Sequence, residues 1–300
     1  MTAITARHLF LVLSGPLYVG AMFGVLFLLR RRRKTRWPFK ADDQLLRGPG
    51  ESLKRQIAKL DEQFAIEFFA GVIVAVGGYD LIGWTISPLF GLNDQTSLFA
   101  SVAGLVTCIA VSMVRIARVW SERSNHFLGW YGERYVAENL EPMRAVGWLI
   151  FHDVPATGSR KPFNLDHVVV GNRGVAVIET KTRRKGAVTP GSKDYVVFYD
   201  GQRLIWPWGE DRHGLEQAVA EADWLRDWIR QVTGIETPVI PILALPGWWV
   251  ESKVRGSVVS VVNPKNIARA IEDRAGGNLT DQQVNAIARQ LDNLCRDVED

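Results

Sequence analysis

The chain reads Asn164-Leu-Asp-His-Val-Val-Val-Gly-Asn-Arg-Gly-Val-Ala-Val-Ile-Glu-Thr-Lys181 over the segment that decides its fold. Two runs of small and β-branched apolar residues, 168–170 and 175–178, flank the tetrapeptide Gly171-Asn-Arg-Gly174. Such runs on either side of a short polar turn are typical of two antiparallel strands. The segment therefore predicts a β-hairpin in which Asn172-Arg173 is the two-residue loop.

The predicted register of this hairpin brings three charged side chains together. Counting outward from the loop, Val168 faces Val177 and Asp166 faces Glu179, and Lys181 shares a face with Glu179 because strand side chains alternate. Like charges directly opposite each other destabilise a sheet. A divalent cation between the two carboxylates would remove that penalty, and oxygen ligands suit Mg²⁺.

The hairpin and the sequence around it resemble a known family. An Asp followed by Glu-x-Lys on the next strand is similar to the PD-(D/E)xK nuclease superfamily. Four segments, in this order and spacing, resemble the nuclease-related domain family, NERD, over residues 126–230: Gly129-Trp-Tyr-Gly-Glu133 at a helix start, Phe151-His-Asp-Val-Pro155, Leu165-Asp-His-Val-Val169 and Gly174-Val-Ala-Val-Ile-Glu-Thr-Lys181. The hairpin together with the upstream Gly-x-x-Gly-Glu motif makes the resemblance to this family specific.

This resemblance implies a metal-dependent nuclease that hydrolyses phosphodiester bonds, with Mg²⁺ or Mn²⁺ as cofactor and nucleic acid, DNA rather than RNA, as partner. Asp166 and Glu179 would be metal ligands, joined by the backbone carbonyl of Thr180. Lys181 would orient or deprotonate the attacking water and offset charge on the phosphate. Glu133 would lie near the metal, as a ligand or hydrogen-bonded to one.

The same residues have structural interpretations. Asp166 can be a polar residue at a strand end, and Lys181 can serve only as an ion-pair partner of Glu179 or Asp166. Glu133 can be an exposed residue of a first helical turn, favoured there by the helix dipole. A Glu after the apolar run Val-Ala-Val-Ile is harder to explain this way, since a buried carboxylate is costly unless it is paired or metal-bound.

Residues 126–300 predict a single α/β domain compatible with the restriction-endonuclease-like fold. Its expected elements are helix 129–141, strands 147–152, 165–171, 174–181, 195–199 and 202–205, helix 214–232, strands 239–245 and 258–261, and helices 264–273 and 281–298. Gln217, in helix 214–232, is a further catalytic candidate. Members of the family that the chain resembles have an Asn-Pro motif before this Gln, whereas this chain has Asp211-Arg-His-Gly-Leu-Glu216.

Three apolar segments in residues 1–125 are long enough to cross a bilayer, so three transmembrane helices are expected to precede the domain. They are 9–29, 68–90, whose one charge is Asp80, and 98–114. The first does not fit a cleaved signal, because its basic cluster follows it. A buried helical hairpin of a soluble protein is the alternative for the second and third.

Basic residues predict the orientation of these segments. Arg30-Arg-Arg-Arg-Lys34 opens a basic linker, 30–66, between the first two spans, and three arginines lie between 115 and 123, whereas the loop Gly91–Thr96 has no Lys or Arg. Basic loops stay in the cytoplasm. We therefore expect a multi-pass protein of the cell membrane, in contact with the lipid bilayer, whose linker and 126–300 domain are cytoplasmic.

The net charge leaves two function classes open. Residues 1–125 hold 15 Lys and Arg against 9 Asp and Glu, net +6, and residues 126–300 hold 21 against 23, net −2, giving +4 overall. The basic excess thus flanks the membrane, where topology explains it. A negative domain favours a non-catalytic nucleic-acid or protein-binding scaffold, because duplex binding is mostly phosphate neutralisation. The intact Asp166, Glu179 and Lys181 favour the nuclease.

Overall fold

The protein is described here by a computed structural model that covers residues 45–156, 162–186, 193–252, 254 and 256–297. Within these residues the chain divides into two compact units. Residues 57–124 form one, and residues 125–297 together with the described part of 41–56 form the other. The predicted span 9–29 and the first part of the predicted linker lie outside the described residues.

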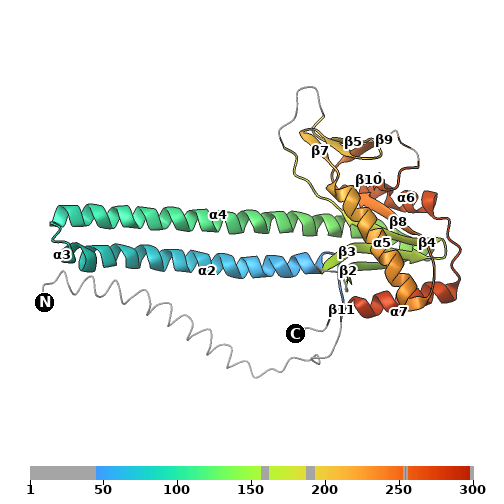
Figure 1. Cartoon of the computed structure of the whole chain (residues 1–300), viewed down its shortest axis with the longest axis horizontal. Helices are drawn as coiled ribbons and strands as arrows, with labels where there is room; N and C mark the ends of the chain where they lie inside the picture. Colours follow the sequence, from blue (N-terminus) through green and yellow to red (C-terminus); the bar gives the residue numbers. More distant parts are fainter. Residues whose placement is uncertain (1–44, 157–161, 187–192, 253, 255, 298–300) are drawn as a thin grey trace, which may run out of the picture. The chain divides into compact units, whose positions relative to one another are not determined.

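The first unit is a helical hairpin. Helix α2 (Glu51–Leu81) continues through a π-helical turn (Ile82–Ile86) into α3 (Ser87–Leu89), and α4 (Asp94–Leu140) returns beside it (Figure 1). Two ion pairs join the helices at the polar end of the hairpin. Arg115 contacts Glu67 at 2.9 Å, and Arg123 contacts Asp61.

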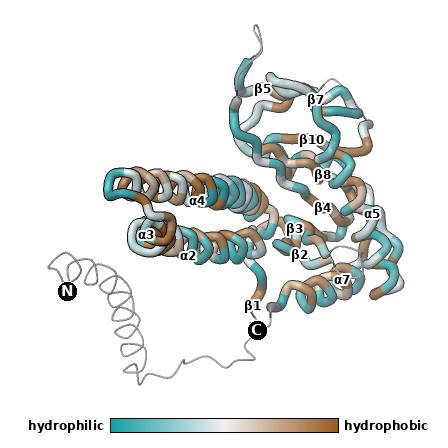
Figure 2. Tube along the Cα trace, turned by 60° about the vertical axis from the view of Figure 1, so that its left-hand side comes forward, coloured by the Kyte–Doolittle hydropathy of each residue, from teal (hydrophilic) through white to brown (hydrophobic). Residues whose placement is uncertain are grey.

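Both arms of this hairpin are long and apolar enough to cross a membrane, one within Glu51–Leu89 and the other within Asp94–Val146. Many of their apolar side chains, among them Val72, Phe99 and Met113, are half exposed or more. Brown stretches of hydrophobic residues are visible along α2, α3 and α4 in Figure 2. The predicted segments 68–90 and 98–114 both lie in this hairpin.

Helix α4 corrects the prediction of a separate helix at 129–141. That segment is the C-terminal end of one helix that begins at Asp94. The segment Gly129-Trp-Tyr-Gly-Glu133 was expected at a helix start, but no proline occurs between 94 and 140 to end the helix that precedes it. The change from apolar to charged composition near residue 115 marks a change of surroundings along one continuous helix.

The second unit is built on a five-stranded sheet of order β10-β8-β4-β3-β2. Strands β2 (Leu149–Ala156), β3 (Phe163–Gly171) and β4 (Gly174–Thr180) are antiparallel, and β8 (Val239–Ala244) and β10 (Ser260–Val262) run parallel to β4. The predicted hairpin register is confirmed, since Val168 pairs with Val177 and Val170 with Val175. Its backbone ladder ends at His167 and Ile178, one step before Asp166 and Glu179.

Helices cover both faces of this sheet. On one face, Val168 and Val177 pack in a core with Leu225 of α5 (His213–Thr233) and Ile287 of α7 (Asp281–Leu294). On the other, Val169 and Ala176 pack with the end of α4 and with α6 (Ile267–Arg274), which follows a 3₁₀ turn at Pro264–Asn266. The alternation of side chains therefore puts Asp166, Glu179 and Lys181 on the α5 face.

A second, four-stranded sheet lies beside the start of α5. Its order is β7-β6-β5-β9, formed by Gly209–Asp211, Leu204–Trp206, Val196–Tyr199 and Trp249–Ser252. The predicted strands 195–199 and 202–205 correspond to β5 and β6. The sequence did not predict β7 and β9, because both are short and largely exposed and lack the alternation of a half-buried strand.

The described residues 45–56 of the predicted linker are part of this domain rather than a linker, and residues 57–66 belong to the helical hairpin. Strand β1 (Leu45–Leu46) pairs with β11 (Arg296–Asp297), and α2 begins at Glu51. Asp153 of β2 accepts hydrogen bonds from the backbone N–H and hydroxyl of Ser52 at 3.1 and 2.6 Å, and from Arg47 at 3.1 Å. The β2–β3 ladder skips Asp153, whose φ is +49°, and this break turns its carboxylate toward Ser52.

Gly132 marks the close approach of α4 to the chain just after β4. A Cβ at this position would lie 2.1 Å from Cγ2 of Thr182, far inside van der Waals contact. Only glycine fits there without movement of Thr182 or the helix. This contact explains why the second glycine of the Gly-x-x-Gly-Glu motif, Gly132, is a glycine.

We predict that Gly132→Ala lowers the free energy of unfolding of this domain by about 1–3 kcal/mol, the usual cost of forcing extra volume into a packed contact. Urea unfolding of the full chain in detergent measures it. Gly48→Ala is the control, since nothing lies within 4 Å of its Cβ position. Equal unfolding midpoints for the two variants would contradict the assigned contact.

Candidate active site at the end of the hairpin

The candidate site begins where the β3–β4 ladder ends. The backbone N–H of Thr180 donates to Oδ2 of Asp166 at 2.7 Å, so the Asp166 side chain takes the place of a ladder partner. The carbonyl of a strand residue points to the same side as its N–H. The Thr180 carbonyl oxygen is thereby directed toward Asp166, as the predicted metal site requires.

Lys181 links the hairpin to helix α5. Its Nζ lies 2.7 Å from Oε1 of Glu179 and donates to Oε1 of Gln217 at 2.8 Å. Gly214 permits this approach, because a Cβ there would lie 3.3 Å from Cγ of Lys181. The structure thus brings the predicted residues Glu179, Lys181 and Gln217 into one hydrogen-bonded chain, although the Asn-Pro word of relatives is missing.

Glu221 extends this chain and was not predicted. Its Oε1 accepts from Nε2 of Gln217 at 2.8 Å, and the residue is only 1 % exposed. A signal for it was present in the sequence. Glu221 lies one turn after Gln217 and beside Ala218, Ala222 and Leu225 in the apolar stripe of the helix, where an unpaired carboxylate is unfavourable.

Glu133 is buried, so the interpretation as an exposed first-turn residue is wrong. It is 6 % exposed and lies well inside α4. Burial, followed by the charges of Asp153 and Glu179, raises the pKa of Glu133 to about 8, against the opposing effects of Lys181 and a hydrogen bond from the Gly50 backbone. Glu133 is therefore protonated in the folded protein at neutral pH.

The other acids of the cluster behave similarly. Burial and the charge of Glu179 raise the pKa values of Asp166 and Glu221 well above their usual range. Burial lowers the pKa of Lys181, but the charges of Glu179 and Asp166 outweigh it, so the net shift is upward. Lys181 is therefore protonated, and the carboxyl groups around it compete with one another for protons or for a cation.

Unpaired oxygen atoms within the cluster test whether a metal ion fits. The Oε2 atoms of Glu133, Glu179 and Glu221 are buried and have no hydrogen-bond partner among the described residues. No three His, Cys, Asp or Glu side chains of the described residues already form a metal cage. Mg²⁺ does not require one, because it is commonly held by one or two carboxylates and keeps several waters. Asp166, Glu179 and the Thr180 carbonyl fit such a site.

His167 lies on the opposite face of the sheet from Asp166, because neighbouring strand residues alternate. It is fully buried, and its Nδ1 lies 2.8 Å from Nδ1 of His152 on the neighbouring strand. Burial lowers the pKa of His167 well below its usual range and that of His152 to about 4. The pair is therefore neutral and belongs to the packing of the sheet.

A model of a known family matches the part of the chain that holds this site. Residues 128–246 match the family model described as nuclease-related domain, NERD. The chain contains a nuclease-related domain. The match includes every residue of the cluster, and its general context is the PD-(D/E)xK-like superfamily. Searches of curated proteins and of solved structures found no match.

We predict that the free energy of unfolding of the nuclease-related domain falls between pH 6.5 and 8 in the presence of a chelator. A carboxyl whose pKa is raised on folding binds more protons in the folded state, so stability decreases as pH rises toward the folded pKa, here by about 1 kcal/mol per pH unit for Glu133. The buried His152 and His167 act in the opposite sense, because they are neutral when folded whereas unfolded histidine is about half protonated at pH 6.5; they offset part of the fall near pH 6.5 and little of it above pH 7.5.

Glu133→Gln should make this slope less steep than in the wild type, while Asp166 and Glu221, whose pKa values are also raised, keep their own share of it; urea unfolding at pH 6.5, 7.2 and 8 measures the slope. Glu138→Gln is the matched control, since Glu138 lies on the same helix with its side chain 71 % exposed. An unchanged slope in Glu133→Gln would show that Glu133 is not the group that holds the proton.

Proposed function

We propose that this chain is a Mg²⁺-dependent nuclease, also served by Mn²⁺, that hydrolyses phosphodiester bonds in nucleic acid, DNA rather than RNA, at the cytoplasmic face of the cell membrane. Its catalytic unit is the nuclease-related domain, with a restriction-endonuclease-like fold. The observation that carries the proposal is the convergence of Asp166, Glu179 and Lys181 on one face of the sheet, with unpaired oxygen atoms beside them.

Each residue has a role that follows from its contacts. Asp166, Glu179 and the Thr180 carbonyl would hold Mg²⁺, which when bound supplies Lewis-acid activation of water and neutralises phosphate charge. Lys181 is held at two points, by Glu179 and by Gln217. Its raised pKa fits a permanently charged donor that stabilises negative charge on the phosphate, rather than a general base.

Gln217 is a positioning residue in this proposal, and Glu221 fixes its amide in turn. The hydrogen bond from Nε2 of Gln217 to Glu221 leaves Oε1 free to accept from Lys181, which sets the orientation of the amide. Glu133, protonated at neutral pH, adds no charge to the site unless a cation draws its proton away.

A non-catalytic binding scaffold is the second candidate, and one observation favours it. Residues 126–300 carry a net charge of −2, which opposes binding of a duplex. Under this alternative, the acidic cluster is a buried ion-pair network around Lys181. It predicts no metal-dependent cleavage and no dependence of binding on Glu179.

We predict that Glu179→Gln reduces Mg²⁺-dependent cleavage at least about a hundredfold, because even residues behind a metal ligand contribute ten- to a hundredfold and Glu179 would be a ligand itself. The assay uses the full chain in detergent with labelled single- and double-stranded DNA and RNA, with Mg²⁺, Mn²⁺ or chelator. Glu216→Gln, an exposed residue next to Gln217, is the control. Cleavage by Glu179→Gln at the wild-type rate would refute the assignment.

We further propose that α2 and α4, with segment 9–29, anchor the domain as a multi-pass membrane protein. Residues 68–89 span about 33 Å at the helical rise, enough for a hydrocarbon core. The ion pairs of Glu67 with Arg115 and of Asp61 with Arg123 lie just beyond the apolar stretch of both helices. This arrangement is expected where paired helices leave the bilayer into water.

The predicted topology can be tested with reporters. A reporter that is active only in the cytoplasm should be active when fused after Asp300 and inactive when inserted at Asn93, because basic residues near span ends resist translocation. Replacing Arg30-Arg-Arg-Arg-Lys34 with glutamines should weaken this asymmetry. Protease access to the nuclease-related domain from outside intact cells would overturn the orientation.

A further inference from the structure

A hollow of about 950 Å³ lies entirely within the second unit. Its lining includes Gly132 and Thr182, the chain neighbours of Glu133 and Lys181, so the hollow and the acidic cluster are built on the same stretches of chain. Its volume is at the upper end of the range for sites that enclose a drug-sized molecule. The nuclease assignment does not account for it.

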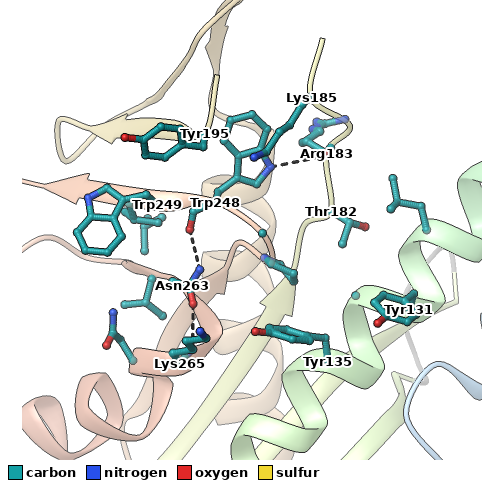
Figure 3. Close-up of a pocket in the computed structure, with 18 of the residues that line it drawn as sticks. Tyr131, Tyr135, Thr182, Arg183, Lys185, Tyr195, Trp248, Trp249, Asn263 and Lys265 are labelled. Atoms are coloured by element: carbon teal, nitrogen blue, oxygen red, sulfur yellow. Dashed lines mark hydrogen bonds between the residues drawn. The ribbon is translucent and has the colours of Figure 1, made fainter. Parts of the chain in front are cut away.

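The lining of the hollow is aromatic. Tyr131 and Tyr135 of α4 stand on one side, and Tyr195 and Trp249 on the other, with Trp248 between (Figure 3). Trp249 is 62 % exposed, Tyr131 60 % and Tyr195 43 %. Large aromatic side chains left this open at one place mark a binding surface rather than a packing defect.

The floor of the hollow is rigid. Trp248 is 1 % exposed, its Nε1 donates to the carbonyl of Arg183 at 3.2 Å, and its own carbonyl accepts from Nδ2 of Asn263 at 2.7 Å (Figure 3). Its ring also packs edge-on against Trp206 at 5.0 Å between centroids. A ligand therefore meets a surface whose conformational entropy is already lost, which favours affinity.

The charges at the hollow have one sign. Arg183, Lys185 and Lys265 line it, and none of the described lining residues is Asp or Glu. Lys185 holds its ammonium 5.9 Å from the ring centroids of both Tyr195 and Trp248. Arg183 is partly neutralised by Asp211 at 2.9 Å, so the lysines are the main phosphate contacts.

We propose that this hollow binds a single-stranded segment of nucleic acid and delivers its backbone to the acidic cluster, an inference that rests on the proposed function. Exposed aromatic rings bind unpaired bases by stacking, which paired bases inside a duplex cannot offer. The lysines that line the hollow bind the phosphates between those bases. The substrate class is therefore single strands or unpaired ends, and the acidic remainder of the domain discriminates against duplex.

Fluorescence anisotropy of the full chain in detergent tests this with labelled oligo-dT, oligo-rU and a duplex, in a Glu179→Gln background with chelator so that nothing is cleaved. Trp249→Ala should weaken binding of the single strands about tenfold, the loss of one stacked base, and Trp249→Phe should restore most of it. Phe198→Ala, a residue of the same small sheet that is 48 % exposed and outside the lining, should bind normally.

The lysines give a second readout that a merely structural role would not change. Lys185→Ala with Lys265→Ala should reduce the slope of log affinity against log salt by about 1.4, or about 0.7 for each phosphate lost from a single strand. Arg269→Ala is the control, because Arg269 lies one turn along from Lys265 with its side chain 84 % exposed and does not line the hollow. Comparison of oligo-dT with oligo-rU separates DNA from RNA.

Outcomes for the hollow and for catalysis are distinguishable. Equal affinity for duplex and single strand, or no effect of Trp249→Ala together with an unchanged salt slope, would overturn the proposal about the hollow even if the wild type cleaves. Loss of single-strand binding in these variants would support it. If the wild type bound single strands in this way but failed to cleave them with Mg²⁺, the proposed catalytic function would be refuted and the proposal about the hollow would stand.

Discussion

The excess of carboxyl groups around Lys181 is the constraint on which this domain depends. Asp166, Glu179, Glu221 and Glu133 surround a single ammonium that contacts Glu179 and Gln217. Acids kept from water cost free energy unless they are paired, protonated or bound to a cation. The raised pKa values of Asp166, Glu133 and Glu221 express that cost. Carboxyl groups perturbed in this way cluster at functional sites, and the proposed cation would offset the cost.

The surrounding elements meet at this cluster because small residues let them approach. Gly132 places α4 against Thr182, and Gly214 places α5 against Lys181. Gly50, with φ +69°, brings the segment before α2 within reach of Trp130 and Glu133, where a Cβ would lie 2.8 Å from the Trp130 ring. Glycine at these points sets how close each helix comes, and so fixes which side chains share the cluster.

Whether a feature could be predicted from the sequence depends on how far apart in the chain the interacting residues lie. The alternation of valines sets the hairpin register locally, so the positions of Asp166, Glu179 and Lys181 were predictable from the segment itself. Glu221 reaches them only after α5 docks on the sheet. The contacts of Asp153 with Ser52, 101 residues earlier, are likewise invisible to local pattern. The continuity of α4 was missed because a segment inside it was expected at a helix start.

The net negative charge of the domain and its proposed substrate are reconciled by where the acids lie. Many exposed acids are already paired within their own helix, as Asp223 is with Arg226 and Asp273 with Arg269. Glu133, Glu179 and Glu221 of the cluster are instead buried, and there they would repel a phosphate unless the proposed cation were bound. Affinity must then come from a surface that does not depend on overall charge. Stacking in the aromatic hollow meets that requirement, because its strength resides in ring faces and needs few phosphate contacts. A domain of this composition therefore suits a substrate whose bases are already unpaired, and its acidity becomes a means of rejecting duplex.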